Sequence, residues 1–259
     1  MAPGSCDTGG VDALSKHQGP EGLGHGAARA YWLDVSAVSE SALAALAGDL
    51  SPEECARAER IRFEEDRKAY VAAHGMLRRG LATALGARPA DLDIRAREDG
   101  KPELFGEHRR AIAFSLSHTR GAAAWAMGTV DEVGVDVEAV GDGALALELA
   151  PRVLGAAERA RLEAHGSAHF FDLWTLKEAF VKATGEGLRR DLRGVAFDWR
   201  DGPVLLAAPG VEPAAWGHLH TRFEASARTY SLSLCASRIG LAGELDGTVH
   251  RVDPSGLRS

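Results

Sequence analysis

The sequence predicts an α+β fold made of two similar lobes with a ligand-binding cleft between them. The first observation is a pair of long helix patterns, at about Glu65 to Leu85 and at about Ala168 to Thr184, each closed by a glycine. The second is that an alternating strand pattern follows each helix, at residues 92–97 and 195–200. Because the order repeats, we expect a pseudo-dimer joined near residues 128–133, with the active site between its halves.

The elements of the first lobe each carry a local signal. A first strand is predicted at residues 30–35, and Ser51-Pro52 begins a helix with Glu54 at the third helical position, as a capping box requires. The long helix that follows carries its apolar residues along one stripe. Two further strands are predicted at residues 111–117 and 122–127.

The second lobe begins with a strand pattern in which valines alternate with other residues, Gly134-Val135-Asp136-Val137-Glu138. The helix at 168–184 is unusually aromatic, so we expect most of it to be buried. A closing strand is predicted at residues 230–235.

Composition suggests where the ordered part of the chain begins and ends. Residues 1–28 are rich in glycine and show little periodicity, which predicts a flexible N-terminal extension. We therefore expect an N-terminal lobe at 29–129, a C-terminal lobe at 130–246 and a flexible tail at 247–259.

Charge and cysteine content narrow the class of protein. The net charge of −7 argues against nucleic acid as the main partner, because phosphate contacts need a basic surface. The three cysteines are far apart and form no CxxC pair, so we expect reduced thiols in a cytoplasmic protein. No stretch reaches the roughly 18 apolar residues that span a bilayer, and we expect no membrane partner.

Three carboxylates and nearby lysines predict a metal and phosphate site. Asp136 and Glu138 are two positions apart, so their side chains share one face of a strand. Glu178 and Lys182 are four positions apart, which makes them neighbours on a helix. Such a group, with Lys177 beside it, suits a hard divalent cation that holds a phosphate-bearing substrate.

Each of these residues also has a simpler explanation. An isolated Asp-x-Glu is more often a solvated strand face, and Glu178 with Lys182 could be an ordinary helix ion pair. Lys101 could be an exposed turn lysine, and His118 a structural histidine at a strand end. The combination of the acidic strand with the buried helix is what favours a site.

Other catalytic motifs are missing from the sequence. It has no GxGxxG dinucleotide fingerprint, no GxxxxGK[ST] phosphate loop and no GxSxG nucleophile elbow. His165 and His169 have helical spacing, but the HExxH glutamate of a zinc site is missing. With no nucleophile in the chain, we expect the attacking hydroxyl to arrive on a second substrate.

At four places the sequence resembles the Sfp-type (group II) 4′-phosphopantetheinyl transferases. Gly134-Val135-Asp136-Val137-Glu138 and Trp174-x-x-Lys177-Glu178-Ala179-x-x-Lys182 match the two signatures of that family. Gly100-Lys101-Pro102 and Phe114-Ser115-Leu116-Ser117-His118 match its two upstream motifs, in the same order. The resemblance covers about Tyr31 to Ser237 and implies the two-lobed fold of that family.

The resemblance also implies a reaction and a set of roles. The family moves the 4′-phosphopantetheine arm of coenzyme A to a serine of an apo acyl or peptidyl carrier protein and releases adenosine 3′,5′-bisphosphate. Magnesium, or manganese in its place, would be held by Asp136, Glu138 and Glu178. Glu178 would also take the proton of the serine, and Lys182 would neutralise charge on the departing group. The coenzyme A contacts implied are Arg57, Arg97, Lys101, Pro102, Ser117, His118, Lys177 and Lys182.

Two alternatives remain open from the sequence. One is a noncatalytic module that binds coenzyme A or carrier proteins, although such a copy should have lost one of the three carboxylates. The other is a different magnesium-dependent phosphotransferase. For the carrier protein we expect a docking surface at Arg189, Arg190 and Arg193, and we expect the chain to act as a monomer.

Overall fold

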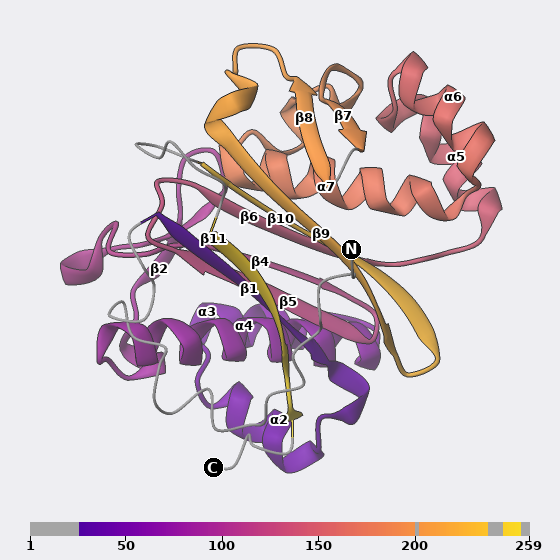
Figure 1. Cartoon of the computed structure of the whole chain (residues 1–259). Helices are drawn as coiled ribbons and strands as arrows, with labels where there is room; N and C mark the ends of the chain where they lie inside the picture. The colour runs from indigo at the N-terminus through magenta and orange to yellow at the C-terminus, as the bar shows by residue number, and fades with distance from the viewer. Residues whose placement is uncertain (1–25, 200–201, 238–245, 255–259) are drawn as a thin grey trace.

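The computed structural model describes residues 26–199, 202–237 and 246–254, which form four stacked layers (Figure 1). Two sheets face each other in the middle, and helices cover the outer side of each sheet. Most of the expected N-terminal extension and the end of the expected tail lie outside the described residues.

The N-terminal lobe is a four-stranded sheet in the order β11-β1-β5-β4, with helices packed on its outer face. β4 is therefore an edge strand of this sheet, and a separate two-stranded hairpin, β2–β3, precedes it along the chain. The elements are β1 (Ala27–Asp34), α2 (Glu40–Ala47), α3 (Pro52–Glu59), α4 (Glu64–Leu85), β2 (Ile94–Ala96), β3 (Pro102–Leu104), β4 (Ala113–Thr119), β5 (Ala122–Gly128) and β11 (Asp246–Val252).

The C-terminal lobe is a three-stranded sheet in the order β6-β10-β9, with α7 lying along its outer face. Two shorter helices and the hairpin β7–β8 pack around α7. The elements are β6 (Val133–Ala139), α5 (Gly143–Val153), α6 (Ala156–His165), α7 (Ala168–Thr184), β7 (Ala196–Trp199), β8 (Pro203–Ala207), β9 (Trp216–Ala225) and β10 (Arg228–Ser237).

The two lobes repeat the same order of elements, which confirms the α+β pseudo-dimer predicted from the sequence. Each lobe runs from a first strand through two short helices, one long helix and a two-stranded hairpin to a closing pair of strands. In each lobe the closing strand pairs antiparallel with the first, β5 with β1 and β10 with β6.

Local sequence determines where the helices begin and end. Ser51 and Glu54 form the expected capping box, in which each side chain accepts from the other residue's backbone N–H, at 3.2 and 2.8 Å. The two long helices end at Gly86 and Gly185, whose φ angles of 66° and 74° lie in the left-handed region that glycine adopts without strain.

The predicted flexible tail at 247–259 is wrong for its first part. Residues Asp246–Val252 form β11, which pairs parallel with β1 and completes the N-terminal sheet. Val252 is buried in the core of that lobe. The segment has weak strand signals of its own, and its pairing with a strand more than 200 residues earlier depends on tertiary structure.

The two faces of β6 have different partners. Val133, Val135 and Val137 are fully buried between the two sheets, against alanines of β1 and β5 and leucines of β10. Because side chains alternate along a strand, Gly134, Asp136 and Glu138 face the other way, toward α7. Asp136 is therefore covered by the helix and only 3% exposed, whereas Glu138 is half-buried.

Gly134 allows α7 to lie directly on β6. A Cβ atom at this position would be 2.0 Å from the carbonyl oxygen of Ala179 and 2.5 Å from the backbone nitrogen of Ala183. These are rigid backbone atoms of α7, so a side chain could fit only if the helix moved away. The close approach brings the later turns of α7 within reach of the acids on β6.

No helix in the described ranges is both long and apolar enough to cross a lipid bilayer.

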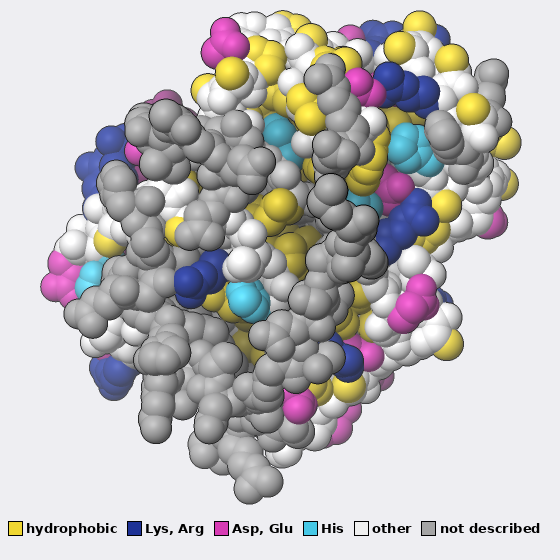
Figure 2. All heavy atoms as spheres, viewed as in Figure 1, with side chains coloured by type: hydrophobic (Ala, Val, Ile, Leu, Met, Phe, Trp, Pro, Cys, Tyr) yellow, Lys and Arg dark blue, Asp and Glu magenta, His cyan; other side chains and the backbone are white. Residues whose placement is uncertain are grey.

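On the face shown in Figure 2, Lys and Arg side chains are interspersed with Asp and Glu, and histidines lie among them. Charge is thus mixed over this face.

We expect Gly134→Ala to lower the free energy of unfolding by about 1–3 kcal/mol, because the added methyl group collides with the α7 backbone. Urea unfolding followed by circular dichroism measures this change. Gly202→Ala is the matched control, since a Cβ there has no heavy atom within 4 Å among the described residues. Equal stability of the two variants would contradict the close packing at Gly134.

Candidate active site

Asp136 joins side chains from both lobes. Its Oδ1 accepts a hydrogen bond from the Ser117 hydroxyl of β4 at 2.8 Å. The same oxygen forms an ion pair with Lys182 Nζ of α7 at 2.7 Å. Its Oδ2 is buried and has no hydrogen-bond partner among the described residues. One oxygen of a buried carboxylate is thus fixed between the lobes, and the other is available to a cation.

Hydroxyl groups fix the position of α7 above the acidic strand. Ser233 and Ser231 of β10 are the cross-strand partners of Asp136 and Glu138. The Thr175 hydroxyl of α7 lies 2.8 and 3.0 Å from the hydroxyls of these serines. One turn earlier, Asp172 accepts two hydrogen bonds from Arg222 of β9, at 2.6 and 2.8 Å. α7 is therefore tied to two strands of the sheet near the acids.

The pKa values of the carboxyl groups depend on one another's charge. Burial, followed by the negative charge of Asp136, raises the pKa of Glu138 to about 7, although Lys182 and a hydrogen bond from Thr119 oppose the shift. The same two causes raise the pKa of Glu178. A bound cation would favour the charged form of all three groups.

The residues present fit a divalent cation with few protein ligands. No three metal-ligating side chains of the described part of the chain lie together as a ready-made metal site. Magnesium, however, takes few carboxylates directly and completes its shell with water and phosphate oxygens, so a carboxylate can also hold it through a bound water. The free Oδ2 of Asp136, beside two carboxyls whose pKa values its charge raises, is suited to that kind of site.

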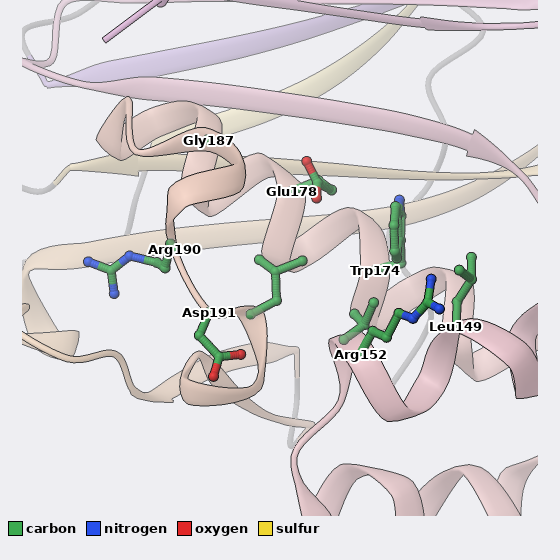
Figure 3. Close-up of a pocket in the computed structure, with 9 residues that line it drawn as sticks. Leu149, Arg152, Trp174, Glu178, Gly187, Arg190 and Asp191 are labelled. Carbon is green, nitrogen blue, oxygen red and sulfur yellow. The ribbon is translucent and has the colours of Figure 1, made fainter.

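A cavity of about 320 Å³ lies beside Glu178, within the C-terminal lobe. In Figure 3, Trp174 and Glu178 project from α7, while Leu149 and Arg152 of α5 form the facing side. The remaining lining residues are Val153, Gly187, Arg190, Asp191 and Leu192. The cavity is thus apolar along one side, with the Glu178 carboxyl as part of its wall.

Basic side chains meet at the end of β4. His118 is exposed, and its ring contacts the edge of the Tyr70 ring of α4, with centroids 5.8 Å apart. Desolvation by surrounding atoms, followed by the charges of His74, Lys182 and Arg57, lowers the pKa of His118 to about 4. Arg57, predicted as a phosphate contact, therefore lies near His118, as does His74, which sequence reasoning missed.

Lys177 is not part of this group, and the predicted phosphate contact is wrong for it. Its side chain is fully buried, and Nζ donates to Glu158 Oε2 at 2.5 Å and to the carbonyl oxygens of Val153 and Leu192 at 2.9 and 3.0 Å. All three ammonium donors are thus used inside the lobe. One position along a helix is a rotation of about 100°, which directs Lys177 away from the face that carries Glu178.

Lys101 and Arg97 lie at the junction of the lobes rather than in the open. Lys101 Nζ pairs with Glu132 and donates to the carbonyl oxygen of Ala183, near the end of α7, at 2.6 Å. Arg97 lies 3.5 Å from the same Glu132 and 2.7 Å from Asp99. Both cations hold the β2–β3 hairpin of the N-terminal lobe against the C-terminal lobe, and Pro102 begins β3 beside them.

The three arginines after α7 differ in their environments. Arg190 is only 9% exposed in its side chain, pairs with Glu186 and lies over the Phe180 ring, so it belongs to the packing of the lobe. Its guanidinium points away from Glu178 in Figure 3. Arg189 and Arg193 are exposed, although Arg193 pairs with Asp191.

A buried ionic group stands behind the basic side chains at the end of β4. The sequence indicates only one part of it, the capping box that contains Glu54. Glu54 Oε2 accepts from Arg78 Nε at 2.6 Å, and Glu54 Oε1 lies 2.9 Å from His74 Nδ1. Arg78 is 1% exposed and also donates to the carbonyl oxygens of Pro89 and Leu92. One carboxylate thus caps α3, compensates a buried arginine and orients a histidine.

Comparison with known families agrees with this two-lobed arrangement. Residues 37–128 match the family described as "4′-phosphopantetheinyl transferase, N-terminal". Residues 132–235 match the "4′-phosphopantetheinyl transferase superfamily". Fold and site therefore define a protein of the phosphopantetheinyl transferase superfamily with both of its characteristic domains.

Similar proteins identify the family within this superfamily. The chain is 35% identical over 153 residues to a protein of Synechocystis sp. (58% of this chain, 62% of the relative), and 34% identical over 156 residues to 4′-phosphopantetheinyl transferase HetI of Nostoc sp. (58% and 66%). It is 30% identical over 170 residues to 4′-phosphopantetheinyl transferase psf-1 of Bacillus pumilus (63% and 70%). The match thus spans less than two thirds of the length of the first two relatives. The chain belongs to the Sfp-type family of 4′-phosphopantetheinyl transferases.

Two solved structures are more distant. A holo-[acyl-carrier-protein] synthase of Thermotoga maritima has a TM-score of 0.32 and 24% identity, covering 41% of this chain and 64% of that one. A Chronobacterium ammoniagenes ACPS–CoA complex has a TM-score of 0.32 and 18% identity, covering 41% and 96%.

The low pKa of Glu54 predicts a stability that depends on pH. Burial alone would raise this pKa, but hydrogen bonds from His74 and Ser51 and the charge of Arg78 lower it from 4.5 to about 2. A carboxyl with a depressed pKa stabilises the fold above its unfolded pKa, so this contribution, about 3 kcal/mol at pH 7, is lost as pH falls from 4.5 toward 2. We expect Glu54→Gln to be less stable by that amount at pH 7, by nearly the same amount at pH 5, and by clearly less at pH 3.

Urea unfolding of both proteins at pH 7, 5 and 3 checks this expectation. Glu59→Gln, an exposed change on the same helix, is the control and should track the unaltered protein at every pH. A difference between Glu54→Gln and the unaltered protein that stays constant with pH would contradict the assignment.

Proposed function

We propose that this protein transfers the 4′-phosphopantetheine arm of coenzyme A to a serine of an apo acyl or peptidyl carrier protein and releases adenosine 3′,5′-bisphosphate. The observation that carries the proposal is the environment of Asp136. One of its oxygens is fixed by Ser117 and Lys182 from opposite lobes, and the other is left for a cation, in a chain of the Sfp-type family.

The residues of α7 would supply the acid–base and charge chemistry. The serine oxygen attacks the phosphorus that carries the pantetheine arm, and the bond from that phosphorus to the departing bisphosphate breaks. Glu178 takes the serine proton, a role for which it is placed because its carboxyl forms part of the cavity wall. The Lys182 side chain lies beside Asp136 and is 31% exposed. Its charge can therefore offset that of the departing phosphate.

Asp136, Glu138 and Glu178 would hold magnesium, or manganese in its place. The cation would neutralise charge on the pyrophosphate of coenzyme A, as metals do in phosphoryl transfer generally. The chain's own contribution is to keep the three carboxylates in register through the β6–β10 pair and Thr175.

The coenzyme A nucleotide would lie at the end of β4, against Ser117, His118 and Arg57. His118 and Arg57 are exposed and close enough for their charges to interact. Lys101 and Arg97 would contribute indirectly, by holding the lobes together, since their charges are already paired with Glu132. Because both walls of the site come from one chain, we also propose that it acts as a monomer.

We expect Asp136→Ala to reduce transfer at least about 100-fold, because the change removes charge stabilisation at the reacting phosphates, and circular dichroism checks that the variant is folded. Mass spectrometry of an apo carrier protein incubated with coenzyme A and Mg²⁺ measures the transfer. Asp131→Ala, an exposed position just before β6, is the matched control and should leave the rate unchanged.

Removal of the metal provides the companion measurement. Transfer by the unaltered protein should stop when a chelator is added and return with excess Mg²⁺ or Mn²⁺. Full turnover by Asp136→Ala, or turnover that ignores the chelator, would contradict the proposed metal site.

For the carrier protein we propose a docking surface at Arg189 and Arg193, the two exposed arginines after α7. Reversing both to glutamate should raise the KM for an acidic carrier protein about tenfold, while the KM for coenzyme A stays the same. Arg88→Glu is the control, an exposed arginine of the N-terminal lobe that pairs locally with Asp91. Steady-state kinetics measures both constants, and an unchanged carrier KM would rule this surface out.

A further inference from the structure

A second histidine next to the predicted nucleotide contacts has no role in the function proposed above. His74 lies on α4, with Nδ1 2.9 Å from Glu54 Oε1, and its side chain is 19% exposed. Neither residue belongs to the four motifs that carry the family resemblance. The pair must therefore be explained from its surroundings.

Glu54 is held firmly and so fixes the orientation of the His74 ring. Its other oxygen accepts from Arg78 Nε at 2.6 Å and from the backbone N–H of Ser51 at 2.8 Å. The His74 ring also stacks on Tyr70, with centroids 4.0 Å apart and planes 27° apart. A carboxylate on Nδ1 keeps the proton there and directs Nε2, on the far side of the ring, to any other partner.

The same tyrosine connects His74 to His118. Tyr70 stacks on one histidine ring and contacts the other edge-on, so the two imidazoles flank it. His74, Lys182 and Arg57 all act as positive charges on His118, while Asp66 acts in the opposite direction. Basic side chains from α3, α4, β4 and α7 thus meet at one place, and a multiply charged anion suits such a cluster.

The two histidines of this cluster lie on the opposite face of β4 from Asp136, whereas Lys182 pairs with Asp136 itself. Ser117 points to Asp136, so its neighbour His118 points to the other face of β4, toward α4. A ligand at the end of β4 therefore meets carboxylates on one side and basic groups on the other. Coenzyme A has two separate phosphate groups, a pyrophosphate and a ribose 3′-phosphate monoester, which matches that division.

We propose that His74 binds the 3′-phosphate monoester of coenzyme A, together with His118 and Arg57, and makes the protein select coenzyme A over its 3′-dephospho form. The inference rests on the proposed function, because it takes coenzyme A as the donor. With Glu54 held on Nδ1, Nε2 of His74 is the ring atom that can donate to the phosphate, and the negative charge of Glu54 strengthens that donor.

The test compares His74→Phe with the unaltered protein. Phenylalanine keeps the stacking on Tyr70 and removes both ring nitrogens. Isothermal titration calorimetry with coenzyme A and with 3′-dephospho-coenzyme A gives the two dissociation constants. We expect the unaltered protein to prefer coenzyme A and His74→Phe to weaken coenzyme A binding about tenfold or more, with no change for the dephospho form.

His108→Phe is the matched control, because His108 also pairs with a glutamate, Glu107, at 3.1 Å and is similarly exposed at 24%. It should leave both dissociation constants unchanged. His74→Gln, which retains a donor, should keep part of the preference and provides a second variant if His74→Phe folds poorly. Equal weakening of both ligands by His74→Phe, or no weakening of coenzyme A, would overturn the inference.

The two proposals can fail separately. A protein that prefers coenzyme A through His74 but transfers nothing to any carrier protein would support this inference and contradict the proposed function. A protein that transfers the arm but binds both donors equally well would contradict the inference alone.

Discussion

One buried carboxylate connects the two halves of this protein. Asp136 is 3% exposed, and its Oδ1 accepts hydrogen bonds from Ser117 of the N-terminal lobe and Lys182 of the C-terminal lobe. A buried charge is costly unless it is paired and hydrogen-bonded, so this interaction constrains how β4, β6 and α7 can be arranged. The free Oδ2 leaves the pairing incomplete, and a divalent cation is the chemistry that would complete it.

The arrangement around Asp136 depends on β6 having two different faces. Its valines are packed between the two sheets, and its glycine and acids lie beneath α7. The strand therefore contributes to the core of the molecule and to the site at once. Gly134 is as important to this as the acids, because only a residue without a side chain lets the α7 backbone approach so closely.

Lysines of similar appearance in the sequence have different surroundings in the structure. Lys177 is fully buried against Glu158, Lys101 joins the lobes through Glu132, and Lys182 lies half-buried beside Asp136. Of the three, Lys182 is the one with exposed surface next to the acids. The nearest carboxylate and the depth of burial decide the role of each ammonium group, and neither can be read from spacing along the chain.

The sequence by itself determined the repeated order of elements, the ends of α4 and α7, and the placement of Asp136 and Glu138 on one face of a strand. These depend on short-range rules: helix and strand periodicity, glycine at helix ends, and alternation along a strand. Only the tertiary structure decided that Asp246–Val252 joins the first strand, that Lys177 is internal, and that His74 and Glu54 lie beside His118. Those outcomes depend on contacts between residues far apart in the chain, where packing and charge compensation select the partners and local pattern does not.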